Sequence, residues 1–350
     1  MDLISRRHWL PCLLGALIIH ATSTPSSHAQ APASDSATVL KFPPTKQVAS
    51  VDGEPVTMSE VQSVLQAAFQ NQEKIRITPP VVAQAVETAI DQRLVRRYIL
   101  TATEGVKDEQ IQEALQRLEA NLKQQNSSLE QYKQQQGLDD AKLREQVNWQ
   151  LSWTKYLNQS LTDASLEACF TRHRRDLDGS QLRVSHVLLR VDQPQVAAAM
   201  QPTIDEAQRI RQEIIDKKLA FADAAKKYSE GPSRRVGGDL GWIGRNGPMM
   251  PAFTDAAFEL EKGAVSEPVI TPFGVHLIQV TDEKAGDKQW TDVQEKLKQI
   301  IATEIVDEIA RQQRATVKIE YVDDFPHFLP GTKDLAPLAG VDAAPSGDAQ

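Results

Sequence analysis

The chain has 350 residues, a formal net charge of −8 and a hydrophobic fraction of 41%. This acidic balance argues against a nucleic-acid partner, because such partners normally bind a basic surface. Only two cysteines are present, and one of them, Cys12, lies in an N-terminal segment expected to be removed, so no intrachain disulfide is expected. The length allows two domains.

Residues 1–29 are typical of an export signal. Arg6 and Arg7 precede an apolar stretch from Leu10 to Ala21, and cleavage is expected after Ala29. The apolar stretch is shorter than the roughly 20 residues that a membrane span needs. We therefore expect a cleaved signal and a periplasmic protein. An uncleaved signal acting as a membrane anchor is the alternative, and a twin-arginine signal is less favoured than the general export route.

Two features follow the signal. Residues 30–46 are rich in Ala, Ser, Pro and Thr, which predicts a flexible linker without a core. Residues 47–56 then predict a short β-hairpin that turns at Asp52 and Gly53, since this dipeptide favours two-residue hairpin turns.

Helical patterns dominate the next hundred or so residues. Thr57 and Glu60 form a capping box that predicts the start of a helix. Trp149 and Trp153 recur at helical spacing and are interpreted as core rather than ligand-binding residues. The polar, Gln-rich stretch 124–136 fits a solvated helix pair, an exposed loop or a partner-binding segment. Helical periodicity is expected over residues 80–103, 108–125 and 139–161.

Two histidines lie inside strand-like runs in the second half of the chain. Residues 183–190 alternate so that His186 shares a face with apolar residues, and residues 274–280 do the same for His276. Both imidazoles are therefore expected to point toward an apolar interior.

This region resembles the parvulin family of peptidyl-prolyl isomerases. The matching pieces occur in the family's order and at its approximate spacing, although any one of them alone would be a weak signal. The resemblance implies a small antiparallel sheet wrapped by helices over residues 181–283, including helices at 204–217 and 221–228. The pieces are His186 to Leu189, Tyr228 to Glu230, Gly237 to Trp242, Met249 with Phe253, Glu267 to Val269, and Gly274 to His276.

The flanking regions resemble the chaperone module of SurA-type and PpiD/PrsA-type exported foldases. Residues 47–180 would form the N-terminal part of this module, and residues 284–324, with an amphipathic helix and a strand, would complete it. The predicted fold class is therefore α+β, with a parvulin domain inserted in a mostly helical module. Residues 325–350 are expected to form a disordered tail.

The resemblance assigns a proline-binding pocket to Leu240, Met249 and Phe253. An aliphatic, a thioether and an aromatic side chain suit a saturated five-membered ring. Trp242 is equally consistent with an extension of that wall and with a structural role beside the glycine loop.

The resemblance also implies that His186 and His276 lie on neighbouring strands and hydrogen-bond through their ring nitrogens, with the Thr271 hydroxyl joining the network. Orientation and polarisation of the site by this pair is favoured over direct proton transfer. A zinc ion is not expected, because no third ligand occurs at ligand spacing. No cofactor is expected either.

One position departs from the family pattern. The family carries cysteine or aspartate eight residues before Asp239, where this chain has Gly231. Either the adjacent Glu230 supplies a carboxylate to the site, or the polar group is lost and the activity is weak. Phosphate recognition is not expected, since residues 191–196 lack a basic cluster.

Three hypotheses follow. The leading one is an exported peptidyl-prolyl isomerase and chaperone that acts on unfolded or extended, proline-containing polypeptides. The second is a non-catalytic holdase that uses the parvulin fold as a peptide-binding module, which Gly231 favours. The third is a membrane-tethered folding factor, and it depends on whether the signal is cleaved.

Overall fold

The computed structural model describes residues 42–69, 77–102, 105–191, 197–332 and 334–337. The predictions for the signal peptide, for most of the linker, for nearly all of the loop that follows Arg190 and for the end of the tail lie outside these residues. No helix in the described ranges is both long enough and apolar enough to cross a membrane.

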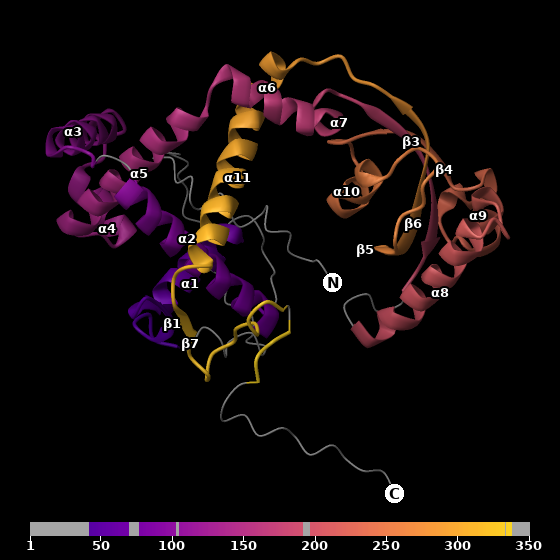
Figure 1. The fold of residues 1–350 in the computed structure, drawn as a ribbon, viewed down its shortest axis with the longest axis horizontal. Coiled ribbons are helices and arrows are strands. Elements are labelled where there is room, and N and C mark those ends of the chain that lie inside the picture. Colours follow the sequence, from indigo (N-terminus) through magenta and orange to yellow (C-terminus); the bar gives the residue numbers. More distant parts are fainter. Residues whose placement is uncertain (1–41, 70–76, 103–104, 192–196, 333, 338–350) are drawn as a thin grey trace, which may run out of the picture. The chain divides into compact units, whose positions relative to one another are not determined.

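The chain divides into two compact units. One spans Asp163–Ile300, and the other combines the segment that ends at Thr162 with the segment that begins at Ile301. The first unit contains a four-stranded antiparallel sheet with helices, and the second is mostly helical (Figure 1). The predicted α+β fold class is confirmed.

A small three-stranded sheet in the mostly helical unit joins the two segments of that unit. Strand β1 (Gln47–Val51) pairs with β2 (Glu54–Thr57) on one side and with β7 (Ile319–Tyr321) on the other. Asp52 and Gly53 both adopt positive φ angles, of 51° and 82°, as a type I′ hairpin turn requires. The predicted hairpin is confirmed.

Among the described residues, five helices follow β2 in the same unit. Glu60 accepts the Thr57 backbone N–H at 2.8 Å, so the predicted capping box forms. The Gln-rich stretch contains a short helix, and Tyr132 packs there against the local apolar cluster. Trp153 is buried and stacks on Trp149, which confirms the core interpretation. The helices are α1 (Met58–Ala68), α2 (Pro79–Ala102), α3 (Asp108–Gln124), α4 (Leu129–Gln136) and α5 (Asp140–Ser160).

The C-terminal segment of this unit is anchored by charge and by apolar packing. Helix α11 (Gln294–Arg314) ends at Arg314, which forms ion pairs with Asp91 at 2.5 Å and Glu87 at 2.9 Å, both on α2. Phe325 is completely buried, with its ring centroid 5.3 Å from that of Phe42. The packed chain therefore continues past residue 324, where the disordered tail was expected to begin, because Phe325 supplies a core side chain.

The unit Asp163–Ile300, called the isomerase-like unit because it contains the region that resembles the parvulin family, is built on a sheet with the strand order β4-β3-β6-β5. Helices α8 and α9 cover one face of the sheet and α10 covers the other (Figure 1). The apolar side chains of α8 and α9 form one cluster with the sheet, and those of α10 form another. The strands are β3 (Gln181–Leu189), β4 (Asp239–Gly244), β5 (Val269–Thr271) and β6 (Gly274–Lys284). The helices are α6 (Asp163–Arg172), α7 (Arg174–Leu177), α8 (Ala197–Ile215), α9 (Phe221–Tyr228), η5 (Pro232–Val236), α10 (Pro251–Glu259) and η6 (Trp290–Val293).

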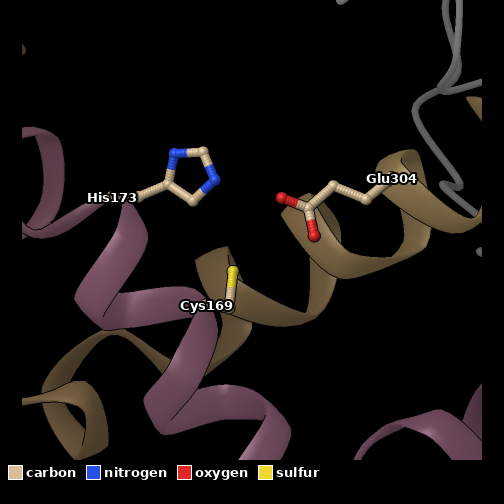
Figure 2. A group of neighbouring side chains, drawn as sticks. All are labelled: Cys169, His173 and Glu304. Atoms are coloured by element: carbon tan, nitrogen blue, oxygen red, sulfur yellow. The ribbon is translucent and has the colours of Figure 1, made fainter.

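Helices α6 and α7 belong to this unit, although they precede its first strand. Cys169 is buried on α6, and His173 follows one helical turn later, between α6 and α7 (Figure 2). After β6 the chain returns to the residues that follow α7. Lys288 donates its backbone N–H to the Asp178 carbonyl, and Gly286 donates its backbone N–H to Ser180 Oγ. The segments that enter and leave the sheet are thus bonded to each other.

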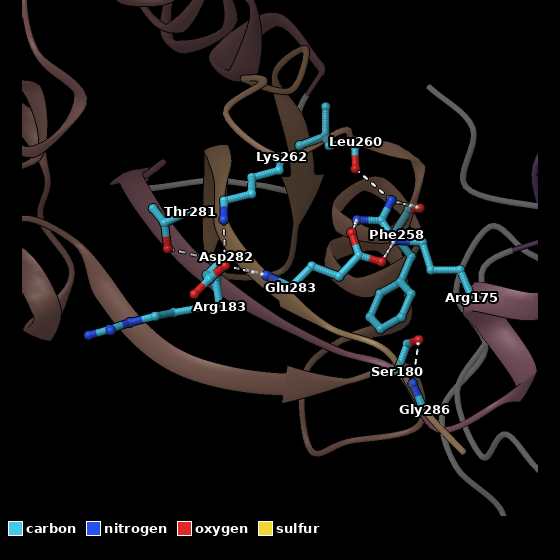
Figure 3. A network of polar contacts seen from close by, with 10 residues as sticks. All are labelled: Arg175, Ser180, Arg183, Phe258, Leu260, Lys262, Thr281, Asp282, Glu283 and Gly286. Atoms are coloured by element: carbon cyan, nitrogen blue, oxygen red, sulfur yellow. Dashed lines mark hydrogen bonds and ion pairs between the residues drawn. The ribbon is translucent and has the colours of Figure 1, made fainter. Parts of the chain in front are cut away.

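Arg175 on α7 stabilises the junction between the segments that enter and leave the sheet (Figure 3). Its guanidinium pairs with both carboxylate oxygens of Glu283, at 3.0 and 2.9 Å, and donates to the carbonyls of Phe258 and Leu260 at the end of α10. Those carbonyls lack helical partners, because the last turn of a helix leaves its acceptors free. One side chain therefore joins α7, α10 and β6.

Replacing Arg175 with alanine should destabilise the isomerase-like unit by about 1–3 kcal/mol, since it removes a bidentate ion pair and leaves two carbonyls without their donor. Arg174→Ala is the matched control. Arg174 is exposed and its ring contact is with Phe170, so its loss should cost no more than about 0.5 kcal/mol. Urea unfolding followed through NMR signals of β3 and β6 measures both, and equal effects of the two variants would refute this role of Arg175.

Candidate active site

Strand pairing brings His186 and His276 together. In the antiparallel β3–β6 ladder, His186 pairs with Ile278 and Leu188 pairs with His276. The two histidines are therefore diagonal neighbours on one face of the sheet, within reach of each other's side chains. Both are buried, with 6% and 5% of their surface exposed.

The two imidazoles hydrogen-bond directly. The Nδ1 atoms lie 3.2 Å apart, and Nε2 of His276 lies 2.8 Å from the Thr271 hydroxyl. Thr271 Oγ1 also accepts the backbone N–H of Phe273 at 3.1 Å. The structure thus brings together three of the four residues predicted to be catalytic, in one chain of hydrogen bonds that starts in the turn between β5 and β6.

Two glycines allow the backbone to come close to β3, one just before β4 and the other at the start of β6. A Cβ on Gly238 would lie 2.3 Å from the His186 carbonyl oxygen, and a Cβ on Gly274 would lie 2.2 Å from that of Leu189. Both glycines also have positive φ angles, 84° and 134°. In the sequence, the Gly237–Gly238 pair just before a strand is the available signal for a close backbone contact.

Burial keeps both imidazoles neutral at pH 7. It lowers the pKa of His276 from 6.5 to about 4, and the charge of a protonated His186 beside it acts in the same direction. Burial likewise lowers the pKa of His186. Because an imidazole in this neutral pair carries one proton, one Nδ1 donates to the other.

An apolar wall borders the pair. The Phe253 ring on α10 stands nearly perpendicular to both imidazoles, with centroid distances of 6.0 Å to His186 and 5.5 Å to His276. Leu240 and Met249 are partly buried against the same cluster as Phe253. The three residues predicted to bind proline are therefore close to one another, and Phe253 is in contact with the histidines.

Trp242 has different neighbours. It pairs across the sheet with the exposed Arg183, and its ring lies 4.2 Å from Lys284 Nζ. The next residue, Ile243, is the one that packs into the cluster around Phe253. Since side chains alternate along a strand, Trp242 points to the opposite face.

Glu230 does not reach the histidines. Its carboxylate accepts the backbone N–H of Arg190 at 3.4 Å, and the side chain is exposed. His186 Nε2 has no hydrogen-bond partner among the described residues, so the Glu230 carboxylate is not hydrogen-bonded to it. In the described part of the chain, neither histidine belongs to a group of three side chains with metal-ligand spacing.

Comparison with known proteins agrees with this geometry. Residues 186–282 match the family Rotamase: PPIC-type PPIASE domain. The foldase protein PrsA of Bacillus subtilis (strain 168) is 31% identical over 229 residues, which make up 65% of this chain and 70% of that protein. The chain belongs to the PPIC-type parvulin family. The resemblance drawn from the sequence motifs is confirmed.

A chaperone and a solved structure are also similar to this parvulin. The chaperone SurA of Cupriavidus pinatubonensis (strain JMP 134 / LMG 1197) is 35% identical over 151 residues, covering 41% of this chain and 28% of that protein. The crystal structure of the peptidylprolyl isomerase PrsA from Bacillus anthracis aligns with 65% of this chain and 97% of that one, at 23% identity and a TM-score of 0.35. Family membership rests on the sequence matches.

The lowered pKa of His276 predicts a pH-dependent stability. An unfolded histidine binds a proton more readily than His276 does in the fold, so the stability present above pH 6.5 is lost as the pH falls toward 4. The loss should be on the order of 3 kcal/mol. Urea unfolding at several pH values, followed through NMR signals of β3 and β6, measures it.

His276→Gln removes the titrating group and leaves the surface carboxylates unchanged. The difference in unfolding free energy between wild type and variant should therefore shrink as the pH drops from 6.5 to 4. Parallel stability curves over this range would show that His276 does not titrate in the predicted way.

Proposed function

We propose that this parvulin is an exported foldase that catalyses cis–trans isomerisation of X-Pro bonds and chaperones unfolded or extended client polypeptides. The observation that carries the proposal is the neutral pair His186–His276 in contact with the Phe253 ring. The family match and the relatives named foldase and chaperone support it.

The geometry suits a reaction in which no covalent bond to the substrate breaks. Rotation about the X-Pro bond has a barrier of about 20 kcal/mol, because the amide loses its resonance as it twists. The catalyst needs to grip the proline ring and to bind the twisted amide more tightly than the planar one. Phe253 with Leu240 and Met249 would grip the ring, and the histidine pair with Thr271 would present a fixed polar surface beside it.

The remaining parts of the proposal concern the rest of the chain. The isomerase domain would be inserted in a helical module, formed by the segments before and after it, that binds clients. Export to the periplasm rests on the signal-like residues 1–29 and on the extracytoplasmic foldases that the motifs resemble. Clients would be exported proteins with exposed proline-containing segments.

A specific observation favours a second function, that of a non-catalytic holdase. Gly231 places no polar side chain beside His186, so the chain could hold peptides without turning them over efficiently. A proline-peptide isomerisation assay, run beside a client-aggregation assay, separates the two functions. Suppressed aggregation with an unchanged isomerisation rate would favour the holdase.

Phe253→Leu should lower kcat/KM for a proline peptide about tenfold, which corresponds to about 1.4 kcal/mol of transition-state binding. The reason is that leucine keeps the core filled but removes the ring that contacts both imidazoles. Isomerisation kinetics at pH 7 measure the effect.

Phe258→Leu is the matched control. Phe258 lies on the same helix, in the same cluster and at a similar burial, but its ring contacts Arg175 and Arg245 rather than the histidines. Both changes should cost about 1 kcal/mol of stability. If the two variants lose activity equally, Phe253 acts only as a core residue and the proposed proline site is wrong.

A further inference from the structure

The side chains of the proposed proline site come from two elements and from the irregular connection between them. Leu240 is on β4 and Phe253 is on α10. Met249 lies in the connection, residues 245–250, and packs against the same apolar cluster as the other two. The shape of the site therefore depends on how α10 is held beside the sheet.

Arg245 is the first residue of that connection, and its guanidinium bonds to two helices. Its Nε lies 2.8 Å from the Asp176 carboxylate on α7, and its Nη1 lies 2.5 Å from the Asp255 carboxylate on α10. Nη1 also donates to the Thr254 hydroxyl at 3.3 Å. Only 18% of the Arg245 side chain is exposed. One largely buried side chain therefore joins the end of β4 to α10.

The bonds from Arg245 reach the two residues of α10 that directly follow Phe253. Thr254 is buried, and its hydroxyl donates to the Pro251 carbonyl at 3.1 Å, so it is itself fixed to the first turn of the helix. Asp255 is two positions after Phe253, which places the two side chains about 200° apart around the helix axis. Bonds to Thr254 and Asp255 therefore oppose rotation of α10, the motion that would turn the Phe253 ring away from the histidines.

The charge of Arg245 is offset by its own partners. Asp176 and Asp255 carry two negative charges against its one positive charge. In the described part of the chain, its side chain contacts these two carboxylates, the Thr254 hydroxyl and the Phe258 ring, and neither histidine. Any effect of Arg245 on the reaction must therefore act through the position of α10.

A second arginine holds the other end of α10. Arg175 donates to the carbonyls of Phe258 and Leu260, where the helix ends. Both guanidiniums lie over the Phe258 ring, 6.0 Å from its centroid for Arg175 and 5.6 Å for Arg245. The two arginines anchor the same helix, but Arg245 is the one bonded beside Phe253. Arg175 therefore provides a control that separates anchoring of the helix from orientation of the ring.

We propose that Arg245 is a positioning residue for the isomerase reaction, because its bonds to Asp255 and Thr254 set the angle at which the Phe253 ring meets the histidine pair. The inference deepens the proposed function and rests on it. The ring has to hold proline while the neighbouring amide twists. Displacing a substrate-positioning group by about 1 Å can cost on the order of a hundredfold in rate. Without the guanidinium, α10 keeps its apolar contacts but loses the bonds that fix its rotation.

Alanine substitutions of the two carboxylates form a matched pair of variants. Asp255→Ala removes the ion pair with α10, whereas Asp176→Ala removes the ion pair of the same guanidinium with α7. The two carboxylate side chains are 48% and 37% exposed, so either change should leave the protein folded. We expect kcat/KM for a proline peptide to fall about threefold or more in D255A and to stay within about 1.5-fold of wild type in D176A. Equal losses in the two variants, or no loss in D255A, would overturn the proposal.

Substitutions of the two arginines compare the two ends of α10. Arg245→Met keeps an apolar stem over Phe258 and removes the guanidinium, so kcat/KM of the full-length protein should fall about tenfold. Arg175→Ala releases the other end of the helix and should leave kcat/KM within about twofold of wild type. Thermal unfolding of each variant fixes a temperature at which all of them are folded, and the kinetics are measured there. An R175A variant that loses as much activity as R245M would show that α10 needs only anchoring, and would overturn the proposal.

A spectroscopic readout follows the orientation of the ring itself. The Phe253 ring stands nearly perpendicular to the His276 imidazole, with the centroids 5.5 Å apart, so its ring current shifts the NMR resonances of the His276 ring protons. These resonances should move in R245M and D255A and stay as in the wild type in D176A and R175A. Unmoved resonances in R245M and D255A would overturn the proposal even if activity fell.

Failure of the inference can be told apart from failure of the proposed function. A wild type without isomerase activity refutes isomerisation as the native function, whereas resonance shifts confined to R245M and D255A would still support the role of Arg245 in orienting Phe253. An active wild type whose D255A and D176A variants are equally active leaves the proposed function intact and removes the inference.

Discussion

The hydrogen bond between the Nδ1 atoms of His186 and His276 is the interaction on which the isomerase unit depends. Two imidazoles whose Nδ1 atoms lie 3.2 Å apart keep this hydrogen bond unless both become protonated, because two protonated rings would present two donors and two charges to each other in a buried site. Burial lowers the pKa of both histidines and so favours their neutral forms, and the apolar side chains of α10 on the same face of the sheet contribute to that burial. The pocket wall and the protonation state are thus two consequences of one packing arrangement.

Local sequence patterns predict much of this arrangement. Alternation along the two histidine strands predicts the face on which each imidazole lies, and Asp52 with Gly53 predicts where β1 ends and β2 begins. Contacts between distant residues carry no such pattern. Arg175 and Glu283 are 108 positions apart, and neither one's surroundings in the sequence indicate the ion pair. The side chain of Trp242 belongs to a motif of the family, yet strand alternation turns it toward Lys284.

The glycines near His186 show why a composition pattern does not distinguish structural from chemical roles. Gly238 has a positive φ angle and its Cβ would collide with the His186 backbone, so its role is steric. Gly231 has an ordinary extended backbone, and the atom nearest to a Cβ built there is Nε2 of His186. In the sequence, Gly238 belongs to a motif that matches the family, and Gly231 stands out only by comparison with the family pattern. The difference becomes visible when the backbone angles and the nearest atoms are known.

Strand β6 connects the histidine pair to the junction at which the chain enters and leaves the isomerase-like unit. His276 lies near the start of this strand, and Glu283 lies near its end, where Arg175 ties it to α7 and α10. A strand fixed at both ends cannot slide along β3, and a shift by one residue would turn His276 to the other face and break the pair. Tension on the segments that flank the unit would therefore meet the Arg175 contacts before it reached the imidazoles.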